Sequence, residues 1–117
     1  MIRRRSEAEV AYKPQIHGGE GFLIFYEMLK PEESAFGMGH FRLATLFPGA
    51  SIGEHLHDGD EEVYCVYEGE GVLTFDGVAH PVKEGDFSLV TPGHRHGLKN
   101  TGQKEMKIII VKVGGKK

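Results

Sequence analysis

The chain has 117 residues, a formal charge of −3 and 17 glycines, and 39% of its residues are hydrophobic. This length fits one domain with one core, and the charge provides no global basic field for nucleic acid. The longest apolar run near the C-terminus, Ile108 to Val111, is too short to span a bilayer, and the Arg-rich N-terminus lacks the apolar stretch of a secretory signal. We therefore expect a cytoplasmic protein that binds neither nucleic acid nor a membrane.

The first 20 residues are polar and end in a glycine-rich stretch, so we expect an N-terminal arm over 1–20 and one domain over 21–117. The basic clusters Arg3-Arg4-Arg5 and Lys116-Lys117 are interpreted as solvated tails. A loop with one helical turn is expected over 30–34. Segments rich in strand formers and bounded by turn residues lie at 22–26, 40–47, 62–67, 72–75, 78–82, 87–90 and 105–113.

The dipeptide Asp76-Gly77 separates two of these segments and is a strong two-residue hairpin signal. No segment has a sustained helical period. Roughly eight to ten short strands with frequent turns are typical of a β-sandwich or barrel. The sequence therefore predicts an all-β fold in a single domain.

A candidate metal set lies around His55-Leu56-His57, which is followed by Glu62 and later by His96. Alternate side chains of a strand point to the same face, so His55 and His57 project together if this segment is a strand. Imidazole nitrogens with one carboxylate suit a divalent transition metal. The spacing alone does not bring His96 beside the other three residues.

Two neighbours compete for these positions. Glu61 lies beside Glu62, but Glu62 shares the strand parity of Tyr64, so Glu61 is expected to face solvent. His94 lies in the turn before His96 and is interpreted as a solvated residue, with a place at the rim of the site or a proton-shuttle role as the alternative. His17 is expected to be exposed.

The spacing of glycine, histidine and glutamate resembles the cupin family. The first motif comprises Gly49, His55, His57, Glu62 and Gly69, and the second comprises Gly85, Pro92-Gly93, His96 and Asn100. One departure is Thr91, where family members usually have proline, although Pro92 follows directly. Together the motifs and the strand between them cover about half of the chain.

The resemblance implies a small single-domain cupin, similar to the germin and oxalate-decarboxylase-like barrels, with a jelly-roll (double-stranded β-helix) barrel. It implies that His55, His57, Glu62 and His96 bind a divalent transition metal, and it prefers His96 over His94 by its offset to Asn100. Manganese or iron is favoured because each prefers six ligands, with zinc, nickel or cobalt as alternatives. The resemblance also implies a homodimer, with residues 1–25 packed or exchanged between subunits.

Three further residues are candidates for a catalytic role. His40 and Arg42 share a face of one predicted strand, and Arg42 would bind a substrate carboxylate if that face is the barrel interior. The alternative for Arg42 is a surface ion pair, and the sequence does not choose between the two. Tyr64 shares the parity of Glu62, and both a pocket-lining role and plain core packing fit it.

The chemistry indicates a metal-dependent enzyme acting on a small oxygen-rich substrate such as a carboxylate, an enediol or a sugar acid. The reaction classes in view are a lyase or decarboxylase, an isomerase and a dioxygenase. The alternative is a non-catalytic cupin that binds or senses a small ligand or a metal. Ile52 occupies the position where oxalate decarboxylases carry an arginine that faces the substrate, so that activity is not transferred.

Overall fold

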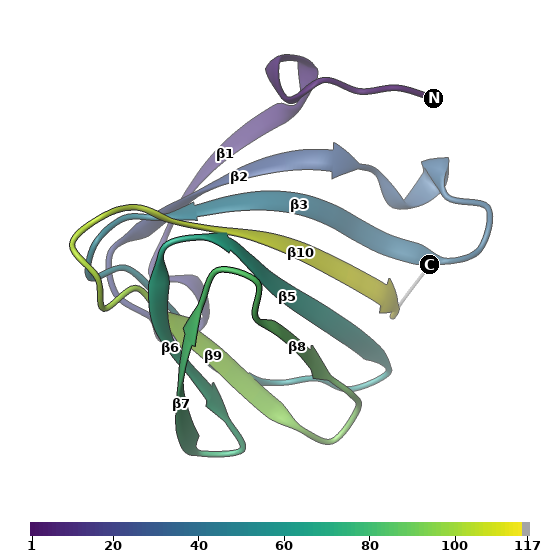
Figure 1. Cartoon of the computed structure of the whole chain (residues 1–117). Coiled ribbons are helices and arrows are strands. Elements are labelled where there is room, and N and C mark those ends of the chain that lie inside the picture. Colours follow the sequence, from purple (N-terminus) through teal and green to yellow (C-terminus); the bar gives the residue numbers. More distant parts are fainter. Residues whose placement is uncertain (116–117) are drawn as a thin grey trace.

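The computed structural model describes residues 1–115, and the predicted tail Lys116-Lys117 lies outside the described residues. These residues form ten strands and three single turns of 3-10 helix (Figure 1). The 3-10 turns are η1 (Arg5–Glu7), η2 (Ile16–Gly18) and η3 (Pro31–Glu33). The strands are β1 (Glu9–Pro14), β2 (Phe22–Leu29), β3 (Met38–Leu46), β4 (Ser51–Leu56), β5 (Asp60–Glu68), β6 (Glu70–Phe75), β7 (Val78–Lys83), β8 (Phe87–Val90), β9 (Arg95–Lys99) and β10 (Met106–Gly114).

The strands form two antiparallel sheets that face one another as a jelly-roll barrel. Six strands pair in the order β1-β2-β3-β10-β5-β8, and four pair in the order β4-β9-β6-β7. In Figure 1, β1 and β2 lie on the side of the larger sheet that is remote from β6 and β7. The inner face of the larger sheet is therefore less covered at β1 and β2 than at β5. The predicted all-β fold in a single domain is confirmed.

Side chains that alternate along the strands fill the space between the sheets. From the larger sheet, Leu23, Ala44 and Ile108 are fully buried, and from the smaller sheet Ile52 and Leu98 are almost fully buried. Each large side chain of this kind stabilises the fold by about 1.5–3 kcal/mol when it leaves water. This period-2 pattern is what the sequence showed at 40–47, and it turns the even-numbered residues of β3 towards the interior.

Two local signals of the sequence have clear structural roles. Asp76 and Gly77 both have positive φ, as a two-residue hairpin between β6 and β7 requires. Asn100 is buried, and its Nδ2 donates to the carbonyl oxygens of Leu46 and Lys104. The Asn100 side chain thus holds the loop between β9 and β10 in place. This gives Asn100, a residue of the second motif that is outside the proposed metal set, a structural role.

Two strands differ from the sequence prediction. β1 lies within the segment 1–20 and extends the larger sheet by pairing with β2. Its residues are mostly exposed, and Glu9 and Lys13 flank the short run Val10-Ala11-Tyr12, which hid the strand in the sequence. β9 carries His96 and lies between β4 and β6, where a Cβ at Gly97 would approach the Ile52 carbonyl to 2.9 Å. Among residues 1–115, no helix is long and apolar enough to cross a membrane.

Candidate metal centre

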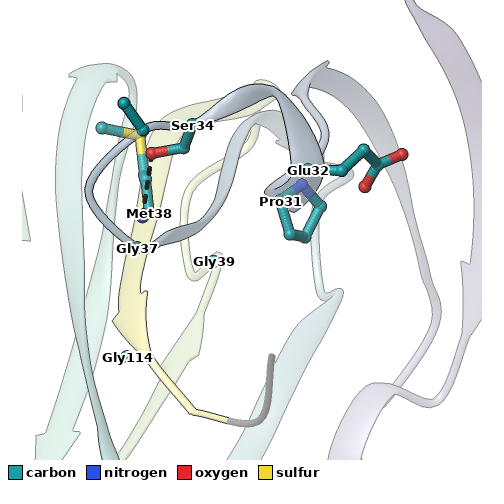
Figure 2. A pocket seen from close by; sticks show the side chains of 8 residues that line it. Pro31, Glu32, Ser34, Gly37, Met38, Gly39 and Gly114 are labelled. Atoms are coloured by element: carbon teal, nitrogen blue, oxygen red, sulfur yellow. Dashed lines mark hydrogen bonds between the residues drawn. The ribbon is translucent and has the colours of Figure 1, made fainter.

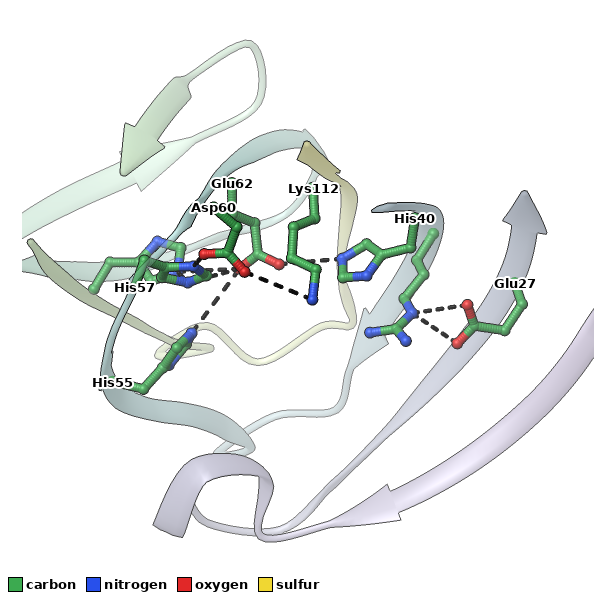
Figure 3. Close-up of polar contacts among 9 residues, drawn as sticks. Glu27, His40, His55, His57, Asp60, Glu62 and Lys112 are labelled. Atoms are coloured by element: carbon green, nitrogen blue, oxygen red, sulfur yellow. Dashed lines mark hydrogen bonds and ion pairs between the residues drawn. The ribbon is translucent and has the colours of Figure 1, made fainter. Parts of the chain in front are cut away.

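Four side chains meet inside one end of the barrel. His55 comes from β4, His57 from the residue after it, Glu62 from β5 and His96 from β9. One nitrogen or oxygen atom of each lies within 4.8 Å of those of the other three. Figure 3 shows the side chains of His55, His57 and Glu62 pointing towards one another. The residues that the sequence proposed as ligands are thus brought together.

The atoms that converge are three Nε2 nitrogens and one carboxylate oxygen. The His57 and His96 Nε2 atoms are 3.0 Å apart, and Oε1 of Glu62 lies 3.1 Å from His96 Nε2 and 3.4 Å from His57 Nε2. Its distance to His55 Nε2 is 3.9 Å. For bonds of about 2.1 Å, neighbouring ligand atoms lie roughly 3.0 to 3.4 Å apart. The distances fit one shared ion, with His55 Nε2 as the nitrogen farthest from Glu62 Oε1.

Hydrogen bonds on the far side of two rings leave Nε2 available to a metal. His55 Nδ1 donates to the Gly53 carbonyl oxygen at 2.8 Å, and His57 Nδ1 donates to Asp60 Oδ1 at 2.7 Å. In a neutral imidazole the opposite nitrogen then carries the lone pair. Lys112 Nζ lies 3.7 Å from the other Asp60 oxygen, as Figure 3 shows. Asp60 was not among the residues that the sequence singled out.

Glu62 divides its two oxygens between the cluster and His40. His40 is buried, and its Nε2 donates to Glu62 Oε2 at 3.1 Å. Burial alone would raise the pKa of the Glu62 carboxyl, but the surrounding imidazoles of His40, His55 and His96 outweigh it and lower this pKa well below its ordinary value. Glu62 is therefore ionised, which is the form that binds a metal.

His96 is the most deeply buried member of the cluster. Its side chain is fully buried, and its ring stacks on Tyr64 with centroids 4.2 Å apart. Burial lowers the pKa of the His96 imidazole below its ordinary value, against the opposing effect of Glu62. The ring is thus neutral at pH 7. Among residues 1–115, its buried Nδ1 has no hydrogen-bond partner.

Tyr64 and Arg42 both lie on the inner face of the larger sheet. The sequence had left open which face of its strand Arg42 occupies, and the structure answers this. Tyr64 is buried, and burial raises the pKa of its phenol well above the ordinary value, so the group stays protonated. Arg42 is half-buried, and its Nε donates to Glu27 Oε1 and Oε2 at 2.7 and 2.8 Å. The ion pair that the sequence allowed is present on the inner face of the larger sheet, where both side chains stay partly exposed.

His17 contacts the site, which the sequence did not indicate. The residue is exposed, as expected, yet its ring stacks on His55 with centroids 3.7 Å apart and an interplanar angle of 14°. The backbones of η2 and β4 approach so closely that a Cβ at Gly53 would overlap the His17 carbonyl oxygen. Positive φ at Gln15 and His17 turns the chain at this point. The glycine pattern around 17–21 was the available signal.

Glu61 and His94, the neighbours that competed with Glu62 and His96 for the metal positions, lie outside the cluster. Glu61 is half-buried on the opposite face of β5. His94 is exposed, and its Nδ1 donates to Asp76 Oδ2 at 2.6 Å. Ile52, at the position considered for a substrate-facing arginine, is a core residue.

Two open cavities border β3. One, of about 350 Å³, lies between η3 and the first residues of β3, and Figure 2 shows Pro31, Glu32 and Met38 around it. Its walls are mainly backbone and small residues. The other, of about 600 Å³, runs over the inner face of β1, β2 and β3 and reaches His40, Arg42 and Lys112. Only the second cavity touches a residue that contacts Glu62.

Comparison with known proteins decides the family. The model of the Cupin domain family matches residues 42–112, which include all four cluster residues. The chain belongs to the cupin family. An oxalate-binding protein from Thermotoga maritima is 32% identical over 95% of this chain and 92% of its own length. An L-ectoine synthase from Saccharophagus degradans is 33% identical over 95% of this chain and 80% of its own length.

A solved structure shares the whole fold of this cupin. The crystal structure of a predicted oxalate decarboxylase from Thermotoga maritima superposes with a TM-score of 0.93 and 30% identity, covering 98% of this chain and all of the other. The relatives carry different names, so they support a cupin that binds small ligands and single out no activity.

Proposed function

We propose that this cupin binds one divalent transition metal through His55, His57, Glu62 and His96 and acts as a metal-dependent enzyme on a small oxygen-rich substrate. The observation that carries the proposal is the convergence of three Nε2 atoms and Glu62 Oε1 inside the barrel. Manganese or iron is favoured, because six-coordinate ions would keep two positions for a substrate; zinc, nickel and cobalt are alternatives. A bound metal would supply Lewis-acid polarisation of a substrate oxygen.

The chain's own residues orient and charge the site. His40 holds Oε2 of Glu62, so that Oε1 faces the three imidazoles. Tyr64 fills the space beside His96 and keeps water from that ring. Three neutral imidazoles and one carboxylate leave a divalent ion with a net positive charge, which favours anionic ligands such as a carboxylate, an enediolate or a sugar acid.

Elemental analysis of untagged protein tests the metal site. Purified protein supplied with manganese or iron is expected to contain about one metal ion per chain, and His57→Ala is expected to lose it. His94→Ala is the matched control, because His94 lies outside the cluster. Absence of bound metal under every supply condition, in folded protein, would overturn the proposal.

A second candidate is a non-catalytic cupin that binds a small ligand. It is favoured by the state of three acid and base groups beside the cluster: His40 bonds Glu62, Asp60 bonds His57, and the Tyr64 phenol is buried. A reaction with proton transfer needs a free group of this kind. Incubation of metal-loaded protein with oxalate or sugar acids, followed by NMR, separates the two: new products indicate an enzyme, and unchanged bound ligand indicates a binding protein.

We further propose a homodimer that packs through the N-terminal strands, as in related small cupins. On the outer face of β1, Val10 and Tyr12 are 45% and 67% exposed, and the neighbouring Phe22 is 51% exposed. Sedimentation of the full chain is expected to give twice the monomer mass, with Tyr12→Glu shifting it towards the monomer.

A further inference from the structure

The inner face of the larger sheet carries two cations that lie diagonally across neighbouring strands. Arg42 on β3 pairs directly with Ile110 on β10, and Lys112 is the next residue of β10 on the same face. Diagonal neighbours of this kind lie about 7–8 Å apart, within reach of long side chains. Both side chains are 32% exposed, so neither is closed off from solvent. One small anion between them can therefore contact both.

The guanidinium of Arg42 is fixed from two sides but keeps donors for a ligand. Its Nε donates to Glu27, and its Cζ lies 5.3 Å above the centre of the Phe25 ring. Within residues 1–115, Nη1 and Nη2 make no hydrogen bond. Two parallel N–H donors on a fixed arginine are suited to bidentate recognition of a carboxylate. Glu27 and Phe25 thus orient Arg42 without occupying its outer donors.

Lys112 supplies a second positive charge that is held less tightly. Its Nζ lies 3.7 Å from Asp60 Oδ2, which is too long for a hydrogen bond. The stem of Lys112 crosses Gly39, where a Cβ would lie 3.3 Å from the lysine Cε. The missing side chain at Gly39 leaves space for this stem, and the ammonium keeps its donors for a ligand.

Arg42 and Lys112 line one open groove that is separate from the metal centre. Its volume of about 600 Å³ lies in the usual range for a small-molecule site. None of the four cluster residues is among its lining residues, and His40 lies between the groove and Glu62, to which its Nε2 donates. Figure 3 shows His40 and Lys112 beside Glu62, and Glu27 on the far side of His40. A ligand in the groove therefore meets Arg42 and Lys112 and leaves the cluster untouched.

The other walls of the groove indicate what the rest of the ligand looks like. Its apolar lining residues include Ala11, Leu29 and Pro31. Its charges are partly compensated, because Lys30 Nζ lies 3.1 Å from Glu9 Oε1 and Glu27 pairs with Arg42. The carboxylates of Glu9, Glu27 and Glu32 would repel a second anionic group on the ligand. A single carboxylate on a short apolar chain fits these walls.

We propose that this groove is a second small-molecule site, in which Arg42 and Lys112 bind the carboxylate of a short aliphatic monoacid. Glu27 acts as a positioning residue, because it touches the guanidinium and not the ligand. The inference goes beyond the proposed function and does not rest on it, since no ligand atom reaches the metal. Binding in the groove is therefore expected with and without a metal in the cluster.

Amide NMR titrations of the zinc-loaded full chain test the inference, with butyrate and its uncharged analogue butyramide as probes. Butyrate is expected to shift the signals of β2, β3 and β10 around Arg42, and to bind roughly tenfold to hundredfold more tightly than butyramide, as a charged bidentate contact provides. His57→Ala, which lacks one proposed metal ligand, is expected to show the same shifts. Equal affinities for the two probes would overturn the inference, and this comparison needs no variant. Shifts confined to the cluster would show that butyrate binds only the metal, which refutes the groove site and supports the proposed function.

Variants assign the two contacts. Arg42→Gln is expected to abolish the preference for butyrate, and Arg42→Lys to retain part of it, because lysine keeps the charge and loses the fork. Lys112→Gln is expected to reduce the preference. Lys13→Gln removes one charge from the same groove and is the matched control, expected to keep the full preference.

Arg42→Gln leaves Glu27 without its partner, so the double variant Arg42→Gln, Glu27→Gln is measured beside it. The double variant keeps a neutral polar pair at these positions and is also expected to lose the preference. Retention of the full preference in the double variant would overturn the inference.

Discussion

The two histidines of the His55-Leu56-His57 pair are held by different means. His57 donates from Nδ1 to the carboxylate of Asp60, which Lys112 approaches from the other side. His55 donates to a backbone carbonyl and stacks on His17, an exposed residue outside the barrel strands. A carboxylate partner raises the basicity of a ligating imidazole more than a neutral carbonyl does. One side of the cluster is thus fixed by charge inside the barrel, and the other by packing against the N-terminal segment.

The largest loss of metal affinity is expected from a substitution of Asp60, on the His57 side of the cluster. Asp60→Asn retains the size of the side chain but replaces the charged acceptor of His57 Nδ1 by a neutral one. Changes in such partners typically weaken metal affinity about 10- to 100-fold. Titration of the apo-protein with manganese against a competing chelator measures the effect. Asp58→Asn is the matched control, because Asp58 is exposed in the same turn and is expected to keep wild-type affinity.

An unchanged affinity in Asp60→Asn would remove the proposed difference between His57 and His55. A loss in both Asp60→Asn and Asp58→Asn would attribute the effect to the net charge of the turn. Only a loss confined to Asp60→Asn supports the hydrogen bond to His57 as the cause.

The buried side of the cluster also predicts how the apo-protein responds to acid. Burial lowers the pKa of His96, so below the ordinary value of 6.5 the unfolded chain binds a proton that the folded chain does not. Stability then falls as the pH falls from about 6.5, by at most about 1.4 kcal/mol per pH unit for this one group. Glu62 also has a lowered pKa, and its contribution is lost only as the pH falls below its ordinary value of 4.5.

Urea unfolding in the presence of a chelator at pH 7.5, 6.0 and 5.0 measures this slope. His96→Gln is expected to have a shallower slope between pH 6.5 and 5.0, because its amide side chain does not titrate. An identical slope in the variant would show that His96 is not the group responsible. A metal-saturated sample is expected to be more stable at pH 7.5 than at 5.0 by a larger margin, because protons compete with the metal for the imidazoles.

The sequence predicted the parts of the molecule that depend on local pattern. Period-2 alternation placed β3 and β5, the Asp76-Gly77 turn placed the β6–β7 hairpin, and the motif spacing pointed to the four residues that now form the cluster. β9 was not predicted, because it is short, contains Gly97 and lies between two strands from elsewhere in the chain. β1 was not predicted, because the charged residues around Val10-Ala11-Tyr12 led to the interpretation of 1–20 as a polar segment.

The contacts around the cluster depend on residues that are far apart in the chain. The sequence left the orientation of Arg42 open, because parity alone allows either face of a strand; the sheet register turns it inwards. It gave no sign that Glu27 would pair with Arg42. The division of the chain at residue 20, the homodimer and the cytoplasmic location stay predictions.

The smallest effect is expected on the other side of the cluster, at His17. A stacked aromatic pair contributes about 0.5–1.5 kcal/mol beyond the area it buries, so His17→Ala is expected to weaken metal affinity about two- to tenfold. The same chelator competition measures it. The reason is that His55, whose Nε2 is already the cluster nitrogen farthest from Glu62 Oε1, would lose the ring that fixes its plane.

His17→Phe separates stacking from the chemistry of the imidazole. Phenylalanine keeps a flat ring against His55 but has no nitrogen, so affinity close to wild type is expected if packing alone holds His55. Equal weakening in His17→Phe and His17→Ala would instead assign the effect to a ring nitrogen of His17. In that case the N-terminal segment would take part in the chemistry of the site. Both His55 and His57 would then be held by a polar group of a neighbouring residue, and packing would not distinguish the two sides.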